Sequence, residues 1–450
     1  MVQRRNTKKK EIYVIDQTKT PAKQFFTFAI PATINMVLSS LIPMVDGLFI
    51  GRVIGEEGIA AVSLCHPIFM TLIATVLMFA VGGTVRTSHN LGAKKLKEAN
   101  QNFNQCLWMI VVVLIILCGI IILFSDVLVD FIAQGKPIAS MSKEYINVMK
   151  FFYPIMMINM TFSIFLRVQG KPQLPMFIGL FGNLVNVVLD FIFILIFKWG
   201  ITGAAYASGI SVIIPFIINI SLYSSNKNIL HFAKFKLDVT IVKDAILNGS
   251  SEFVGNISTS ICIFIVNTLL LRNSGHYGVA AYSILSYILK LQGMIITGLT
   301  IGIGPLIGFY YGAKDKKQIF KIYSVAIKTG LVVGAVFWLF IVFFHTGLAN
   351  VFAPGEERIM DMAKSFYIIT ALACLFNGIN FLTSTCFTSM GKAKESFIIA
   401  ILRSMVFYIV LSFILPRIFH GDCVWYFYPG AEILTVFFSI YLMRKYWKKG

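Results

Sequence analysis

Two aspartates, Asp46 and Asp190, stand inside long apolar stretches of this chain. A carboxylate is expensive to keep inside a membrane, so an acidic residue at such a position is a functional candidate. Asn35 and Ser39 precede Asp46 at helical spacing. At about 100° per residue, the three side chains fall within about 40° of one helix face. The first apolar stretch therefore carries a polar stripe that ends in a carboxylate.

A second polar stripe leads to Asp190. Asn183, Asn186 and Asp190 follow one another at the spacing i, i+3, i+7, which again places them on one helix face. The next apolar stretch carries Ser208. With a rise of about 1.5 Å per residue and alternating helix directions, Asp46, Asp190 and Ser208 are expected roughly 5–11 Å below the same membrane surface. Three helices would thus bring oxygen ligands to one depth.

Two carboxylates at one depth in a medium of low dielectric constant cannot both stay charged and unpaired. Either one of them holds a proton, or a cation sits between them. Carboxylate, amide and hydroxyl oxygens are ligands that hard cations such as Na⁺ prefer, and a carboxyl pair that shares protons is equally a proton relay. Two structural alternatives remain open: Asp46 could lie at a helix end among lipid headgroups, and the asparagines could hydrogen-bond between helices.

Four charged residues form a different group in the second half of the chain. Glu252, Lys290, Arg403 and Glu432 are expected at comparable depths inside separate apolar stretches. Two acids and two bases sum to zero charge, which favours mutual pairing in the bundle interior over exposure to lipid. The alternatives are a structural network and a role in substrate binding or gating. His66 is expected to be a packing residue.

The elements that must position these residues are membrane-spanning helices. Of the 450 residues, 57% are hydrophobic and only 13% are charged, which leaves too little polar surface for a soluble domain of this size. Stretches of 18 or more apolar residues can each cross about 30 Å of hydrocarbon as a helix. We predict an all-α polytopic membrane protein with twelve transmembrane helices at residues 24–49, 59–82, 104–124, 145–168, 174–197, 201–223, 245–271, 278–303, 321–345, 363–389, 396–416 and 424–443.

The two sets of six helices look like copies of one unit. Residues 35–82 and 255–302 match at one constant offset along the chain, and duplicated hydrophobic halves with the transport path between them are common in secondary transporters. We therefore expect two pseudo-symmetric six-helix bundles, 24–223 and 245–443, with tails at 1–23 and 444–450. Residues 224–244 would be a basic, partly helical linker. The matching pairs are Gly58 and Gly278, Ala60 and Ala280, Ala61 and Ala281, Ser63 and Ser283, and Gly82 and Gly302.

The basic residues set the orientation. The chain has 39 Lys and Arg against 20 Asp and Glu, a net charge of +19, and most of these bases fall in both tails and in loops on one side of the predicted helices. The positive-inside rule places this side in the cytoplasm. We expect a multi-pass protein of a bacterial-type plasma membrane with both termini cytoplasmic. Because the charge is spread over several short segments of one membrane face, it does not indicate nucleic-acid binding.

Several short motifs lie in or next to these helices. They are Val45–Gly51 (VDGLFIG), Gly58–Ser63 (GIAAVS), Asn186–Asp190 (NVVLD), Gly203–Ser208 (GAAYAS), and the paired loop sequences Gly92-Ala93-Lys94 and Gly312-Ala313-Lys314. Together they resemble the multidrug and toxic compound extrusion (MATE) transporters. The resemblance covers residues from about 25 to 443.

The resemblance implies two bundles of six helices around a central cleft, with a cation site in the first bundle. That site maps onto Asp46, Asn186, Asp190 and Ser208, the last in place of the family's threonine. Asn35, Ser39 and Asn183 would be its supporting polar stripe. Phe191 stands where the family usually has proline, so the sequence does not support the family's helix bend at this position, although it keeps the ligands. Glu252 is expected near the cytoplasmic start of its helix, which does not support a second coupling site in the second bundle.

The sequence thus predicts an antiporter that exports amphipathic, often cationic, drugs and toxic organic compounds by alternating access, driven by H⁺ or Na⁺. A flippase of lipid-linked oligosaccharides on the same twelve-helix plan is the main alternative, and the sign of the charge lining the central cleft would separate the two. A channel is less favoured. We find no catalytic motif and no nucleotide-binding domain, so we expect no enzyme, no cofactor and no metal other than Na⁺ at the coupling site. The expected partners are small organic substrates and the bilayer, around a monomer.

Overall fold

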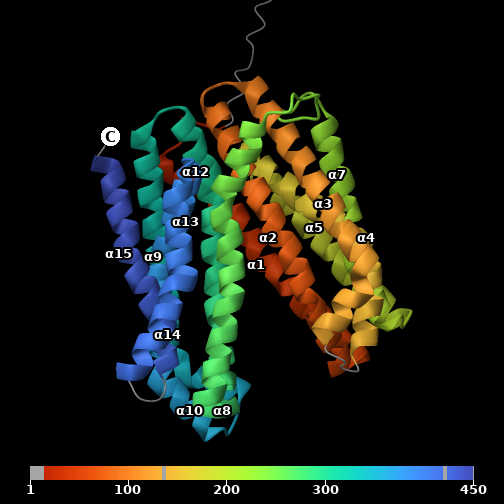
Figure 1. Cartoon of the computed structure of the whole chain (residues 1–450), viewed down its shortest axis with the longest axis vertical. Helices are drawn as coiled ribbons and strands as arrows, with labels where there is room; N and C mark the ends of the chain where they lie inside the picture. The colour runs from red at the N-terminus through yellow and green to blue at the C-terminus, as the bar shows by residue number, and fades with distance from the viewer. Residues whose placement is uncertain (1–14, 134–137, 419–422, 449–450) are drawn as a thin grey trace, which may run out of the picture.

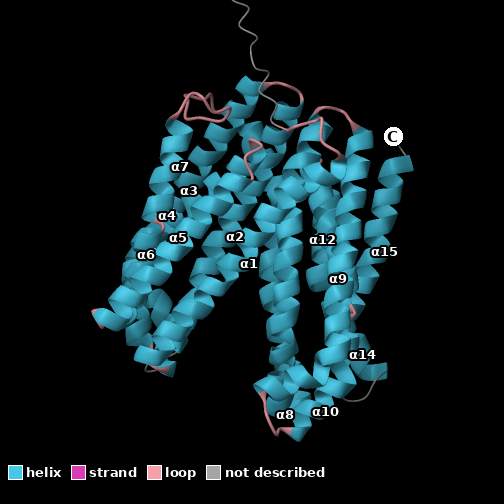
Figure 2. Cartoon of the chain, turned by 180° about the vertical axis from the view of Figure 1, so that it is seen from behind, coloured by secondary structure: helices cyan, strands magenta, loops and turns pink. Residues whose placement is uncertain are grey.

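The computed structural model describes residues 15–133, 138–418 and 423–448. Helices account for nearly all of them, and no strand occurs in these ranges (Figure 2). Eleven helical segments are long and apolar enough to cross a membrane. The helices of the first half are α1 (Pro21–Val53), α2 (Glu56–Gly92), α3 (Leu96–Ala133), α4 (Ala139–Val168), α5 (Gln173–Asp190) with a π-helical continuation (Phe191–Ile196), α6 (Gly200–Ser211) and α7 (Ile213–Ser224).

The second half begins with α8 (Val239–Gly312), whose 74 residues would measure roughly 110 Å as one rod. That is far longer than a bilayer is thick, and the helix breaks at Gly275, where φ is 63° and ψ is −158°. Glycine has no Cβ atom and adopts a positive φ without steric strain, so Gly275 allows the chain to reverse direction here. Splitting α8 at Gly275 gives twelve spans. The expected all-helical, multi-span fold is confirmed.

Helix α9 forms the next span alone. Helices α10 to α12 form one span from shorter pieces, α13 and α14 form another, and α15 with the short turn before it forms the last. Their bounds are α9 (Lys316–Phe352), α10 (Glu357–Met362), a π-helical turn (Ala363–Tyr367), α11 (Ile368–Ala371), α12 (Ala373–Ser389), α13 (Ala393–Ile401), a second π-helical turn (Leu402–Val406), α14 (Phe407–Ile418), a 3₁₀ turn (Cys423–Tyr426) and α15 (Phe427–Lys448).

The two groups of helices meet at one end and diverge at the other. Figure 1 shows α1 to α7 on the right and α8 to α15 on the left, close together at the top, where α15 ends, and apart at the bottom. The hydrophobic core follows this shape. A core cluster shared by both halves contains Phe28 and Leu91 together with Ile303 and Leu306, whereas separate clusters fill the rest of each half.

Glycine pairs let the two halves meet backbone to backbone. A Cβ atom on Gly92 of α2 would lie 1.9 Å from the carbonyl oxygen of Phe309, and one on Gly312 of α8 would lie 2.0 Å from that of His89. Gly312 corresponds to Gly92, and Phe309 to His89, at the offset that relates the two halves. The contact is therefore reciprocal, as expected where two copies of one unit face each other across a pseudo-twofold axis. Only a residue without a side chain fits at either position.

The predicted linker, residues 224–244, is helical only at its two ends. Residues 225–238 contain no helix, whereas α8 already begins at Val239. Side chains of α3 satisfy the backbone of the non-helical part. Gln105 donates to the carbonyl oxygen of Asp238 at 2.7 Å and accepts from its N–H at 3.1 Å. Asn104 and Asn100 bind the backbone of His231 and Ala233 in the same way.

Candidate cation site and central cavity

Asp46 and Asp190 lie side by side in the first half. Asp190, the last residue of α5, has no exposed surface, while Asp46 in the last two turns of α1 is half-buried. Their side chains are near enough to share a hydrogen bond when one of the two carboxyls carries a proton. Two helices that are far apart in sequence thus bring two acidic groups to one point, with no basic side chain in an ion pair with either among the described residues.

The oxygens of this pair have few partners. Within the described chain, neither carboxylate oxygen of Asp190 and neither amide atom of Asn186 has a hydrogen-bond partner, although all of these atoms are buried. The same holds for Oδ1 of Asp46. Buried polar atoms are normally satisfied, so this group has the capacity to hold a proton, a cation or water. Carboxylate and amide oxygens fit Na⁺ as well as they fit a shared proton.

The predicted supporting stripe divides between two places. The amide nitrogen of Asn183 on α5 is buried without a described partner. Asn35 of α1 packs against α5, where a Cβ on Gly179 would lie 2.6 Å from its Oδ1. Asn35 and Ser39 also line a cavity between the halves. Ser208 of α6 is half-buried, and its carbonyl oxygen accepts a bond from Ser211 at 2.8 Å. No hydrogen bond among the described residues joins its hydroxyl to either aspartate.

The helix that carries Asp190 changes its geometry immediately after that residue. Residues Phe191–Ile196 form a π-helical segment rather than a continuation of the α-helix. Such segments have looser backbone hydrogen bonding and are frequent at functional sites. This π-helical segment forms although position 191 is phenylalanine and not proline. The sequence alone did not predict it.

Tyr145 is a neighbour of the carboxyl pair that sequence reasoning missed. It belongs to α4 and lies close enough to Asp46 and Asp190 to interact electrostatically with both. Cys65 of α2 lies nearby and bonds to the carbonyl of Ser142 at 3.6 Å. A tyrosine at the first position of a predicted span looks like an ordinary interfacial aromatic residue, so only the fold could place it beside the carboxyls.

A cavity of about 520 Å³ lies between the two halves, towards the end at which they meet. Its walls are mostly apolar and hydroxyl-bearing side chains. Two charged residues line it, Arg167 of α4 and Glu252 of α8. Arg167 is only 4% exposed, and its guanidinium donates to the carbonyl of Ser163 at 3.2 Å. The lining comes from α1, α2, α4, α8 and α12, for example Met36, Leu77, Ile164, Thr300 and Thr388.

The charged residues of the second half are only partly brought together. Arg403 and Glu432 form an ion pair with 3.5 Å between Nη1 and Oε1, and both are largely buried. Asn380 donates to the Glu432 carboxylate at 2.7 Å, and Ser439 donates to Asn380 at 2.8 Å. The Arg403 guanidinium also stacks 3.5 Å from the centre of the Phe381 ring.

The other two members of this group lie outside the ion pair. Glu252 is half-buried in the cavity wall. It interacts electrostatically with Arg403 but forms no ion pair with it among the described residues. Lys290 is exposed and forms no ion pair within the described residues; it acts electrostatically on His66 of α2 instead. The structure thus gives Arg403 and Glu432 a mutual contact, places Glu252 in the cavity wall and leaves Lys290 exposed outside the ion pair.

Comparison with known proteins identifies the class. The MatE family profile matches residues 31–192 and, a second time, residues 253–414. The chain belongs to the MatE family, as its motifs indicated, and is a transporter rather than an enzyme.

Individual relatives agree with this assignment. The chain is 27% identical over 447 residues to a protein of Staphylococcus saprophyticus named multidrug export protein MepA, with 97% of each chain covered. It is 25% identical over 424 residues to the protein of the same name from Staphylococcus haemolyticus, covering 94% of this chain and 93% of that one.

Solved structures match the fold. A MATE family transporter of the MOP superfamily, described in an outward-facing conformation, superposes with a TM-score of 0.88 at 22% identity over 97% of both chains. A MOP superfamily transporter from Pyrococcus furiosus, for which a reversed polarity of the binding pocket was reported, gives a TM-score of 0.87 at 23% identity and the same coverage.

Proposed function

We propose that this protein exports amphipathic, often cationic, organic compounds in exchange for H⁺ or Na⁺. The relatives that match along nearly the whole chain are named as multidrug exporters, which supports the direction and the substrate class. The cavity between the halves supports a substrate path there. Residues 24–223 and 245–443 would rock against each other, and the protein would act as a monomer in a bacterial-type plasma membrane.

The coupling site is the pair Asp46 and Asp190 with Asn186, and Ser208 supplies a further ligand as α6 adjusts. The observation that carries this proposal is the buried Asp190, whose two oxygens have no described partner while a second carboxyl faces them. Binding of H⁺ or Na⁺ removes repulsion between the two carboxylates. A ligand can shift a conformational equilibrium only by binding one state more tightly, so the two states must differ in how closely the carboxyls approach.

Helix α1 connects this site to the cavity. Asn35, Met36 and Ser39 line the cavity, and Asp46 follows about two turns later on the same helix. Pro43 stands between them and removes one backbone hydrogen bond, which weakens the helix at that point. A change in the distance between α1 and α5 at the carboxyl pair would therefore move the part of α1 that touches substrate.

With the tails and basic loops in the cytoplasm, the shared core and the glycine contacts close the cytoplasmic end. The divergent helix ends in Figure 1 would then face outward, as in an outward-facing state of the cycle. The cavity lining carries one acid, Glu252, and one base, Arg167. It is not the arginine- and lysine-rich lining that anionic lipid-linked glycans would require, so export of organic compounds is the better-supported function.

Transport by the purified protein in proteoliposomes tests the proposal. Efflux of a fluorescent cationic compound should follow either an imposed pH gradient or an imposed Na⁺ gradient, and Asp190→Asn should reduce the gradient-driven part to background. Compound binding in detergent should survive in Asp190→Asn, because asparagine resembles the protonated acid in shape. Export by this variant at the native rate under both gradients would contradict the mechanism and leave Asp190 a packing residue.

A further inference from the structure

The same position on the two halves is covered by a chain segment in the first half, whereas no described segment is hydrogen-bonded across it in the second. The first turns of α3 and α9 correspond at the offset that relates the halves, so that Asn100 and Gln101 match Phe320 and Lys321. On α3 these positions bind the linker: Asn100 accepts from the N–H of His231 at 2.9 Å, and Gln101 donates to the carbonyl of Lys236 at 3.2 Å. No segment of the described chain crosses α9 in this way.

The bare face of α9 forms a shallow pocket of about 330 Å³ against the end of α15. Three lysines line it, Lys316, Lys317 and Lys321, all exposed and none in an ion pair or hydrogen bond within the described residues. They stand at i, i+1 and i+5, on the same side of the helix as Phe320. Their methylene stems line the pocket, whose surface is almost wholly apolar, and their three unpaired ammonium groups lie outside that surface.

The nearest acid in the sequence does not neutralise these lysines. Asp315 caps α9 and accepts a hydrogen bond from the N–H of Gln318 at 3.0 Å. It has no ion pair to any described lysine, and it does not line the pocket.

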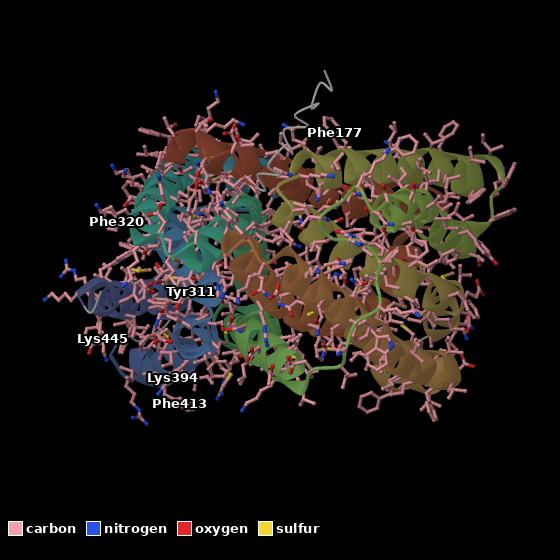
Figure 3. The ribbon with its side chains drawn as sticks, turned by 90° about the horizontal axis from the view of Figure 1, so that it is seen from above. Phe177, Tyr311, Phe320, Lys394, Phe413 and Lys445 are labelled. Atoms are coloured by element: carbon pink, nitrogen blue, oxygen red, sulfur yellow. The ribbon has the colours of Figure 1, made fainter. Side chains whose placement is uncertain are left out.

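Aromatic rings form the remaining wall. Phe320 and Trp447 meet edge to face, with 5.3 Å between ring centroids and an interplanar angle of 86°. The indole N–H of Trp447 is buried and has no acceptor among the described residues. Figure 3 shows Phe320 and Lys445 on the outer edge of the second half, whereas Tyr311 lies nearer the interior. The pocket therefore faces away from the substrate cavity.

We propose that this pocket, defined by Lys316, Lys317, Phe320, Lys321 and Trp447, binds the headgroup of an anionic phospholipid. It lies at the ends of two membrane-spanning helices, the level at which tryptophan and lysine meet headgroups. The ammonium groups bind the phosphate, and the aromatic edges contact the glycerol and the first methylenes. The bound lipid covers the ends of α9 and α15, as the linker covers the first turns of α3.

Binding of short-chain lipids to the detergent-purified, full-length protein tests this site. The probes are dioctanoyl phosphatidylglycerol, dioctanoyl phosphatidylcholine and inorganic phosphate, and the readout is the dissociation constant from native mass spectrometry and from thermal stabilisation. We expect phosphatidylglycerol to bind the wild-type protein at least about tenfold more tightly than phosphatidylcholine. Removing charge with K316Q/K317Q/K321Q should abolish this preference, since each lysine near the surface contributes about fivefold.

The matched control removes three exposed lysines from the same membrane face of the other half, K94Q/K95Q/K97Q. It should keep the preference within about twofold. An equal loss in both triple variants would show diffuse surface charge and overturn the site. Absence of a preference in the wild type would overturn it as well, and so would inorganic phosphate that binds as tightly as phosphatidylglycerol, because the ligand would then be a soluble anion.

Two further variants guard against loss of folding. Lys321→Glu reverses one charge at an exposed position and should weaken phosphatidylglycerol binding by at least about tenfold with an unchanged thermal midpoint in the absence of lipid. Trp447→Phe keeps the ring contact with Phe320 and removes only the buried N–H, so it should keep binding within about twofold. Native affinity in Lys321→Glu would overturn the proposal. Neither readout involves transport, so failure here leaves the proposed export function untouched.

Discussion

The two halves share one helical plan but differ in the partners of their buried acids. In the first half, Asp190 has another acid, Asp46, as its neighbour, and its oxygens lack described partners. In the second half, Glu432 is held by Arg403 and Asn380. At the position of the second half that corresponds to Asp46 stands Val266. The two halves are therefore similar scaffolds, and among the described residues only the first carries a carboxyl pair without a basic partner, the pair that we propose exchanges the coupling ion.

This difference has an energetic meaning. A buried acid that is paired and hydrogen-bonded is a fixed part of the structure, and removing one partner is strongly destabilising. A buried acid next to another acid is destabilising until a proton or cation arrives, so its free energy depends on the ion gradient. The first half is thus suited to sensing the coupling ion, and the second half to holding its helices in place.

The largest expected contrast concerns export by matched carboxyl variants. Asp46→Asn should lower gradient-driven efflux at least about 100-fold, because one carboxyl of the pair can no longer change its charge. Glu432→Gln should lower efflux per folded molecule less than about fivefold, since that acid serves an ion pair. Efflux rates in proteoliposomes, normalised to reconstituted protein, measure both. Equal losses would remove the functional distinction between the halves.

The neutral ligands of the first-half site should have a graded effect. Asn186→Ala and Ser208→Ala each remove one oxygen and leave both carboxyls, so we expect weaker cation affinity rather than complete loss. For a Na⁺ site the Na⁺ concentration for half-maximal efflux should rise about three- to tenfold, in line with one lost ligand of about 1 kcal/mol. For a proton site only the pH dependence should move. Unchanged cation dependence in Ser208→Ala would remove that residue from the proposed site.

The glycine contact should respond alike from either half. Gly92→Leu and Gly312→Leu each place a side chain where the opposite carbonyl lies about 2 Å from the Cβ position. Both should prevent the two ends from meeting and leave efflux at background while the protein inserts normally. A cysteine introduced in the cavity wall at Ser88, which faces Gly308 of the other half, should then react faster with cytoplasmic thiol reagents. A severe effect from one glycine and none from the other would contradict the reciprocal contact.

The sequence predicted the scaffold well because each span is a long apolar run and the repeat is visible in aligned glycines. Helical spacing was also enough to bring Asp46, Asn186 and Asp190 into one hypothesis. It did not find Tyr145, whose proximity to the carboxyls depends on how α4 packs, nor the π-helical segment after Asp190, which no proline marks. Nor did it find how the non-helical residues 225–238 are held, because their backbone partners, such as Gln105, lie on a helix far away in the sequence.

The four second-half charges show a further limit. Depth along each helix is readable from sequence, but rotation about the helix axis is set by packing. Arg403 and Glu432 face each other, and Lys290, at a comparable predicted depth, points out of the pair.

Neutralising Glu432, which is in an ion pair, should lower the stability of the fold, whereas neutralising Asp190, which is not, should not lower it. Glu432→Gln leaves Arg403 without its counter-charge and should lower the free energy of unfolding by about 3 kcal/mol. Adding Arg403→Met should restore part of this loss, because the uncompensated charge is gone. Asp190→Asn should leave the unfolding free energy unchanged or higher. Denaturant unfolding in a mild detergent measures all three variants, and additive losses in the double variant would count against pairing.

The smallest expected effect concerns the hydrogen bonds by which α3 holds the linker. Gln105→Leu leaves the N–H of Asp238 without a described partner and removes one of the two hydrogen bonds to its carbonyl oxygen, which also accepts from the N–H of Ile241, at a cost of about 1–3 kcal/mol. The linker should then leave α3 more often and expose Lys227, Lys234 and Lys236 to trypsin. Efflux per intact molecule should stay close to native, because Gln105 contacts neither the carboxyl pair nor the cavity lining.

The control for the linker is Gln101→Leu, which removes a single, half-exposed bond at 3.2 Å to Lys236. Its cost should be below about 0.5 kcal/mol, since water can replace an exposed hydrogen bond. Cleavage of Gln105→Leu by trypsin should therefore be several-fold faster than cleavage of Gln101→Leu or the wild type. If Gln105→Leu resists trypsin as well as the wild type does, the linker is held by its apolar contacts, such as Leu230 in the shared core, rather than by the amide side chains of α3.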